Sequence, residues 1–487
     1  MTVAVNHNGF RIPLRWRRAP FPALAATGSA AALSSLLAGT MLPANKALII
    51  LPVIATILVF TAFVSILKSR VGLNLFGEVG FIYLTLAVAY TIFPAITFLL
   101  ADLDMASGWL WDTLSLLLPS PAALGAHLWR HVLFIAGVSI GYLLVRGKSG
   151  PPKRTEAVKE RSDSALIVML ASIILCCMFW VYYLSAPVVV YWDHYTRFEH
   201  LGWFSMRFIY ICLTLKTGGY FILLALSFPY WKTHRLLILA VVAGLVVYET
   251  SYTMGQRIES LTILLAAICL YHYHVKPVTL KMGMVAFLGI LALFTAVEIF
   301  RLVGFNFSMA QSSVAQEGLR PASEFGAVYF TSFHLYAERA QGSLPPRNWQ
   351  LLFNDFLSLI PFIDHTQWNP QYWYARYYFP DAIVPPQTLG PIAESAIWGG
   401  EIDLAIRSLI NGAIFAWLVR WFLKRKDHWW AMAIYAYLYA TCVMTLKYSV
   451  FYQLTPLVRI LVPSLLVAYL IRKAIWFNRR KTEPSSG

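Results

Sequence analysis

Long apolar runs recur along most of this chain and alternate with short polar segments. A helix needs ~20 mainly apolar residues to cross the ~30 Å hydrocarbon core of a bilayer. The pattern therefore predicts an all-α, polytopic integral membrane protein with about twelve transmembrane helices. The predicted spans are roughly 22–42, 47–67, 77–100, 123–145, 165–189, 207–229, 236–254, 258–275, 282–300, 404–422, 429–446 and 454–474.

The interval 301–403 departs from this pattern, because it is too polar to span a bilayer and too long for a simple turn. It mixes arginines, acids and aromatic residues. Loops held by a rigid scaffold often carry binding sites, so we expect the site here. The chain then divides into an N-terminal segment 1–21, nine spans in 22–300, one large outer loop in 301–403, three spans in 404–475 and a tail 476–487.

The basic residues predict the orientation of the helices. The chain has 39 Lys and Arg and a net charge of +16, which taken alone would suggest nucleic acid. Most of these residues, however, lie in short segments at alternate helix ends, as the positive-inside rule requires. The segments are 1–18, 68–75, 146–164, 231–235, 276–281, 420–428 and 472–487. We therefore predict no nucleic-acid partner, a lipid bilayer as surroundings and both termini in the cytoplasm.

The remaining basic residues lie at the outer face or at membrane depth, against the rule. Arginine there is costly and usually needs an anionic partner, and its planar fork matches phosphate oxygens. An anionic ligand on the outer side is one interpretation. Snorkelling to lipid headgroups and simple ion pairs are the alternatives.

Two parts of the outer loop are rich in aromatic residues. Apolar positions between Asn348 and Ile363 have helical spacing and predict a helix lying in the membrane interface. The run 368–379 contains Trp373, Tyr374 and Tyr377. These rings suit the CH faces of sugars, although an interfacial aromatic belt would have the same composition.

Several familiar chemistries lack their motifs. No phosphate-binding P-loop, dinucleotide fingerprint, zinc-protease motif or nucleophile elbow is present. The five cysteines lie in apolar runs and form no C-x-x-C pair. His127 and His131 share a helical face but have no identifiable third ligand. We therefore predict no cofactor and no metal site.

Four constellations remain as candidate chemistry. A Gly-Gln-Arg sequence ends at Arg257 and opens a span, where backbone N–H groups favour anions. Arg320 precedes Glu324 in the sequence Arg-Pro-Ala-Ser-Glu-Phe-Gly. Glu394 lies in Leu-Gly-Pro-Ile-Ala-Glu-Ser at the return to the membrane, and Arg459 enters the last span.

The order of these elements resembles the Wzy-type polymerases of O-antigen and capsular polysaccharide. The resemblance covers roughly 250–475 in motif order. It comprises the Gly-x-Arg helix start, an outer loop with Glu-Phe-Gly, an Ala-Glu element and an arginine in the last helix. The family usually has Phe-Gly after the glutamate of the Ala-Glu element, whereas the present chain has Trp398-Gly399-Gly400 after Glu394.

The resemblance implies an enzyme at the periplasmic face of the bacterial inner membrane. Such polymerases join oligosaccharide repeat units carried on undecaprenyl pyrophosphate, sometimes with a chain-length regulator as partner. It implies Glu394 or Glu324 as the base that accepts the proton of the acceptor hydroxyl. It also implies cations on the leaving pyrophosphate, with Arg257, Arg320 and Arg459 first and Arg376 behind them.

Three other functions share part of this pattern. A lipid-linked oligosaccharide flippase would also need arginines and many spans, although no internal repeat is apparent. An O-antigen ligase uses the same lipid donor. A further class is a glycosyltransferase that uses a polyprenyl-phosphate sugar, for which Asp102 and Asp104 in the first outer loop are compatible.

Overall fold

The structure is a computed structural model of the full chain of 487 residues. It describes residues 44–72, 74–100, 121–147, 162–186, 198, 200–252, 257–286, 288–290, 292, 321–360, 368–380, 389–449 and 454–482. Every regular element in these ranges is a helix, and no strand occurs among them, which confirms the all-α part of the predicted fold class.

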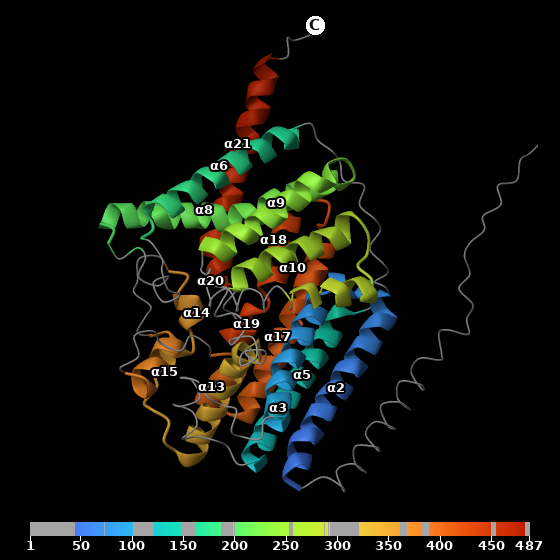
Figure 1. The fold of residues 1–487 in the computed structure, drawn as a ribbon, viewed down its shortest axis with the longest axis vertical. Coiled ribbons are helices and arrows are strands. Elements are labelled where there is room, and N and C mark those ends of the chain that lie inside the picture. Colours follow the sequence, from blue (N-terminus) through green and yellow to red (C-terminus); the bar gives the residue numbers. More distant parts are fainter. Residues whose placement is uncertain are drawn as a thin grey trace, which may run out of the picture.

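The helices are named in chain order (Figure 1). They are α2 (Ala44–Val71), α3 (Val79–Leu100), α5 (Pro121–Arg146), α6 (Ser162–Leu184), α8 (Trp203–Ser227), α9 (Trp231–Tyr252), α10 (Arg257–His274), α13 (Pro321–Gln341), α14 (Asn354–Leu357), α15 (Pro370–Tyr378), α16 (Pro391–Ile397), α17 (Glu401–Leu423), α18 (Trp429–Thr441), α19 (Met444–Lys447), α20 (Leu454–Pro456) and α21 (Val462–Thr482).

Seven helical stretches in the described part of the chain are long and apolar enough to cross a membrane. They are Ala47–Val71, Ala122–Arg146, Ser164–Leu184, Trp203–Ser251, Glu401–Leu423, Trp429–Lys447 and Leu454–Asn478. The stretch Trp203–Ser251 holds both α8 and α9. The predicted span 22–42 and most of 282–300 lie outside the described residues. Several membrane-spanning helices are thus supported, and the total of about twelve stays a prediction.

Helices α5 and α17 form the closest pair of the fold and run parallel. Contacts pair the start of α5 with the start of α17, through Arg130 and Glu401, and the two ends through Arg420 and Val145. Glycines allow this approach: a Cβ on Gly141 would lie 2.1 Å from the backbone oxygen of Leu409. Small residues let backbones pack closely inside membranes, where burial of apolar groups does not drive association.

The remaining long helices fall into two groups (Figure 1). Helices α2, α3 and α13 lie beside the α5–α17 pair, whereas α6, α8, α9, α10 and α18 cross at the other end of the molecule. Apolar side chains from both groups join one large buried core, which includes Tyr83, Phe221 and Tyr437. The core holds the second half of the chain against the first.

The described part of 301–403 contains four helices, α13 to α16, before α17 begins at Glu401. The predicted helix over 348–363 is wrong as a single element, because only the short turns Trp349–Leu351 and Asn354–Leu357 form before the described segment ends at 360. Several of its apolar side chains are nevertheless exposed, with Trp349 at 63% and Phe353 and Phe356 also exposed, whereas Leu351 is buried. A position in the membrane interface stays a prediction.

Candidate functional site

The site is built around α16, the short helix that carries Glu394. Pro391 occupies its first turn, where a fixed φ and a missing N–H cost nothing. Glu394 also lies in this first turn, where the helix dipole favours a negative charge. All seven residues of α16 are buried. The sequence therefore starts a helix here and the fold encloses it.

The N-terminal end of α16 is fixed against the end of α19. The Leu389 backbone N–H donates to the carbonyl of Lys447 over 2.7 Å. Gly390 sits so close to this segment that a Cβ would lie 2.1 Å from the carbonyl oxygen of Leu446. Only glycine fits at position 390, so the start of α16 has one position relative to the last spans.

Two arginines hold the C-terminal end of α16. The Nη1 group of Arg339 donates to the carbonyls of Ala396 and Trp398, over 3.0 and 2.9 Å. Arg347 donates from Nη1 to the carbonyl of Ile397. Cations near the last carbonyls of a helix satisfy groups that lack a partner and complement the dipole. The chain then turns at Gly400, whose φ of 64° favours glycine, and enters α17.

Glu394 is paired with an arginine that it shares with a second acid. Arg407 Nη1 donates to Glu394 Oε2 over 3.0 Å, and Arg407 Nε donates to Asp403 Oδ2 over 2.5 Å. The three side chains are 9%, 13% and 23% exposed for Glu394, Arg407 and Asp403. One cation therefore faces two carboxylates at the entrance to α17.

A third acid reaches this site from α14. Asp355 accepts a hydrogen bond from the Ser449 hydroxyl, and Thr455 donates to the Asp355 carbonyl over 3.3 Å. Its charge acts on both Glu394 and Arg407. Further along the same segment, the carbonyl of Ile360 accepts from Arg459 Nη2 over 3.2 Å. The segment from Asp355 to Ile360 is thus bonded to residues just before and at the start of the last helix.

The surroundings change the acidity of Glu394. Burial raises the pKa of the Glu394 carboxyl to about 8, against the lowering effect of Arg407 and with the help of Asp355 and Asp403. A carboxyl with a pKa near neutral pH exchanges protons within the working range, and as an anion it is a stronger base than an ordinary glutamate. The site can therefore accept a proton.

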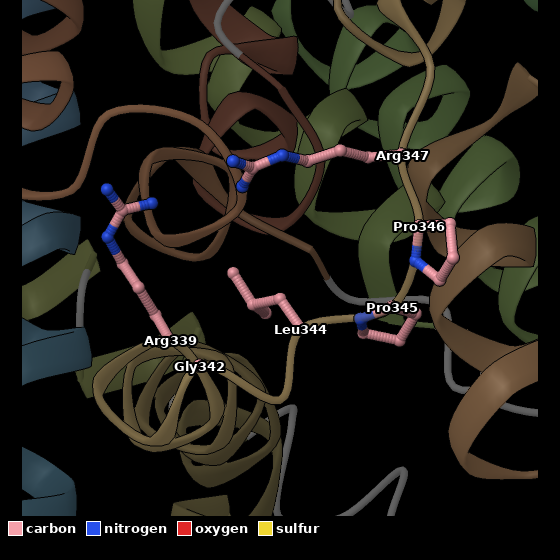
Figure 2. A pocket seen from close by; sticks show the side chains of 6 residues that line it. All are labelled: Arg339, Gly342, Leu344, Pro345, Pro346 and Arg347. Carbon is pink, nitrogen blue, oxygen red and sulfur yellow. The ribbon is translucent and has the colours of Figure 1, made fainter.

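A cavity of about 450 Å³ opens beside the C-terminal end of α16 (Figure 2). Its lining is Arg339, Gly342, Leu344, Pro345, Pro346 and Arg347. In Figure 2 the Arg347 side chain extends above Leu344 toward the guanidinium of Arg339. Among the described residues, no acid lines this cavity.

The predicted cationic residues are only partly within the described structure. Arg320 lies outside the described residues, and the side chains of Arg257 and Glu324 do as well, although both positions are helical. Arg376 is exposed on α15. Arg459 is exposed in a π-helical turn, Leu457–Leu461, and is the predicted cation that the structure connects to the Glu394 site.

The predicted sugar-binding aromatics differ in exposure. Trp373 is buried and its Nε1–H donates to the carbonyl of Pro346 over 2.9 Å. Tyr374 is buried and hydrogen-bonds His334 Nδ1 at 2.8 Å. Tyr377, on the same helix, is 47% exposed. Of the three, Tyr377 presents a ring face, and stacking on sugar stays a prediction.

Sequence reasoning missed the residues that surround Glu394. Asp403 and Arg407 had a local signal, since residues four apart face each other on a helix. Arg339 and Arg347 were visible only as unassigned arginines of the predicted outer loop. Asp355 had no signal, because its partner Ser449 lies 94 residues away.

A separate buried ion pair lies within the apolar helices. Lys216 of α8 contacts Glu249 of α9, and the Tyr220 hydroxyl donates to Glu249 over 2.7 Å. Glu259 lies nearby in α10, and its buried Oε2 atom has no hydrogen-bond partner within the described part of the chain. Ionisable groups at membrane depth are expensive, so their retention points to a role.

Comparison with protein-family models, curated proteins and solved structures gave no match to this chain.

Proposed function

We propose that the protein is a polysaccharide polymerase, a membrane glycosyltransferase that joins oligosaccharide units carried on undecaprenyl pyrophosphate. In this proposal it is a multi-pass protein of the bacterial inner membrane with about twelve spans, both termini cytoplasmic and the 301–403 loop in the periplasm. The single observation that carries the proposal is Glu394, a buried carboxyl with a pKa near 8 just before a membrane-spanning helix.

The proposed reaction uses Glu394 as general base. The acceptor hydroxyl loses its proton to the carboxylate while its oxygen attacks the anomeric carbon of the donor sugar. The bond from that carbon to the pyrophosphate oxygen breaks, and the lipid pyrophosphate leaves. The energy comes from the activated donor, so no nucleotide is required.

Charge develops on the leaving pyrophosphate and needs cations in fixed positions. Arg459 supports this role, because it is exposed near the segment that carries Asp355. Arg257 and Arg320 remain candidates on sequence grounds. Arg407 has a different proposed role, because it is already bonded to Glu394 and Asp403 and thereby sets the acidity of the base.

Deletion of the chain from its host, followed by electrophoresis of the lipopolysaccharide, tests the proposal. A polymerase defect collapses the ladder to core plus one repeat unit. A ligase defect leaves polymer on the lipid carrier and none on the core. An unchanged pattern of every surface glycan would reject the proposal.

A lipid-linked oligosaccharide flippase is the second candidate, and one observation favours it. The Lys216–Glu249 pair and the nearby carboxyl of Glu259 lie among apolar helices, where ionisable groups often mark a transport path. In the same experiment a flippase defect removes even the single-repeat band and traps lipid-linked units on the cytoplasmic side. Deletion of a polymerase and deletion of a flippase therefore give different band patterns on the gel.

A further inference from the structure

The cavity beside α16 is lined by two cations, Arg339 and Arg347, that no carboxylate of the described residues contacts directly. Within the described residues, neither Arg339 nor Arg347 forms an ion pair, and Glu401, whose charge reaches Arg339, is bonded to Arg130 instead. Arg339 and Arg347 each use Nη1 to hold backbone carbonyls, which are neutral acceptors. Arginine also has Nε–H and Nη2–H donors in a planar fork. Those donors remain for a ligand.

The arrangement of the two arginines favours an oxyanion. Figure 2 shows both guanidinium groups on the same side of Leu344, with the Arg347 side chain extending toward Arg339. Two like charges in one cavity repel unless an anion lies between them. Carboxylate and phosphate oxygens are the groups that match the arginine fork. The positions of both side chains are fixed, because the α16 carbonyls hold them.

The rest of the lining favours a ring rather than a bare ion. Leu344, Pro345 and Pro346 form an apolar wall, and the guanidinium of Arg347 lies 5.7 Å from the ring centre of Trp398. The volume of about 450 Å³ is within the ~300–1,000 Å³ of small-molecule sites. A sugar ring with apolar CH faces and one carboxylate would use both the wall and the fork.

We propose that the Arg339–Arg347 cavity binds a carboxylate-bearing sugar, of the uronic acid class. Because the cavity adjoins the helix of Glu394, the bound sugar belongs to the glycan that the enzyme extends, and the repeat unit is acidic. This last step rests on the proposed function, whereas the binding itself does not. Inorganic pyrophosphate is the competing source of oxyanions.

Binding is measured on the purified full chain in detergent by saturation-transfer NMR, which detects weak ligands. The probes are a disaccharide ending in glucuronic acid, the same disaccharide ending in glucose, and inorganic pyrophosphate. We expect the acidic disaccharide to bind at least tenfold more tightly than the neutral one. Higher salt should weaken it, and pyrophosphate should not displace it.

Three variants locate the site. Arg347→Gln should lose binding of the acidic probe. Leu344→Trp should also lose it by filling the cavity while both arginines remain, which covers the case in which Arg347→Gln disturbs α16. The matched control is Arg207→Gln, since Arg207 is exposed and lies 5.5 Å from the ring of Trp203, far from this cavity in the chain. Arg207→Gln should bind as the parent protein does.

Three results would overturn the inference: equal binding of the neutral and acidic probes, displacement by pyrophosphate, or the same loss in Arg207→Gln. None of these depends on polymer formation. The two proposals can fail separately. If the purified protein binds the acidic probe but its deletion leaves every surface glycan of the host unchanged, the proposed polymerase is refuted and the acidic-sugar site stands.

Discussion

The two ends of the α5–α17 pair hold buried arginine–glutamate contacts of different kinds. At the C-terminal end of α5, Arg146 donates two bonds of 2.7 Å to Glu78, and Tyr142 donates a third to the same carboxylate. At the other end, Glu394 receives one bond from Arg407, which is also bonded to Asp403. The first carboxylate is saturated with donors and the second is not.

The surroundings of the two carboxylates also differ, because hydrogen-bonded groups lie next to Glu78 and further acids lie near Glu394. Tyr273 and Tyr435 donate to the carbonyl of Gly77, next to Glu78. The charges that act on Glu394 are instead those of Arg407 and of two further acids, Asp355 and Asp403. A saturated buried pair fixes one arrangement of helices. An acid held among other acids keeps a readily exchanged proton, which a structural contact does not need.

The largest expected effect is on turnover. Glu394→Gln keeps the shape of the side chain and removes the proton acceptor, so we expect polymer formation to fall by about 10²- to 10⁴-fold. The measurement is transfer between lipid-linked repeat units by the purified protein. Glu401→Gln is the control, because Glu401 is an exposed acid at the start of α17, paired with Arg130. Unchanged turnover in Glu394→Gln would exclude Glu394 as the base.

Substitutions at the Glu78–Arg146 pair, at the other end of the α5–α17 pair, should change the stability of the protein rather than its turnover. Arg146→Ala leaves the Glu78 charge buried without its cation, which costs about 3–5 kcal/mol. We expect a clear fall in the thermal midpoint in detergent. Arg420→Ala, at the same end but exposed, should change stability by no more than about 0.5 kcal/mol. Equal effects of the two variants would contradict the structural role of the Glu78–Arg146 pair.

Substitution of Arg407 and substitution of Asp403 should shift the pKa of Glu394 in opposite directions. Arg407 lowers the pKa of Glu394 and Asp403 raises it. Because the deprotonated base is the active form, activity should rise with pH through a midpoint near 8. We expect Asp403→Asn to move this midpoint to lower pH and Arg407→Gln to move it higher. A pH–rate profile with the same midpoint in all three proteins would refute this account.

The raised pKa of Glu394 should also make the stability of the folded protein depend on pH. The folded state holds the Glu394 proton more tightly than the unfolded chain, whose carboxyl has an ordinary pKa of 4.5. Stability should therefore fall as pH rises from about 4.5 to about 8 and then level off. Glu394→Gln lacks this loss, so its thermal midpoint should exceed that of the parent at about pH 8 and approach it at about pH 5. A constant difference across this range would contradict the raised pKa.

The smallest expected effect concerns the aromatic helix α15. Tyr377→Ala removes an exposed ring, so it should leave stability nearly unchanged. If the ring stacks on sugar, turnover should fall by up to about tenfold, the value of one aromatic contact. Tyr374→Ala is the contrast, since it removes a buried ring and should lower stability first.

The sequence alone determined the helical class and the approximate spans. The predicted span 123–145 matches α5 at Pro121–Arg146, and 404–422 matches α17 at Glu401–Leu423. This agreement has a local cause, because a span needs only a run of apolar residues of sufficient length. The sequence also singled out Glu394, as the carboxylate of the Ala-Glu element at the predicted return to the membrane, and its role as a base stays a prediction.

The tertiary structure alone decided which side chains meet. Nothing in the sequence joins Asp355 to Ser449, or Arg347 to the carbonyl of Ile397, because these contacts depend on how distant helices pack. Packing also turned Trp373 inward and left Tyr377 exposed, although both belong to one aromatic run. Composition predicts that a helix forms, whereas the face it buries is set by the neighbours that the fold brings to it.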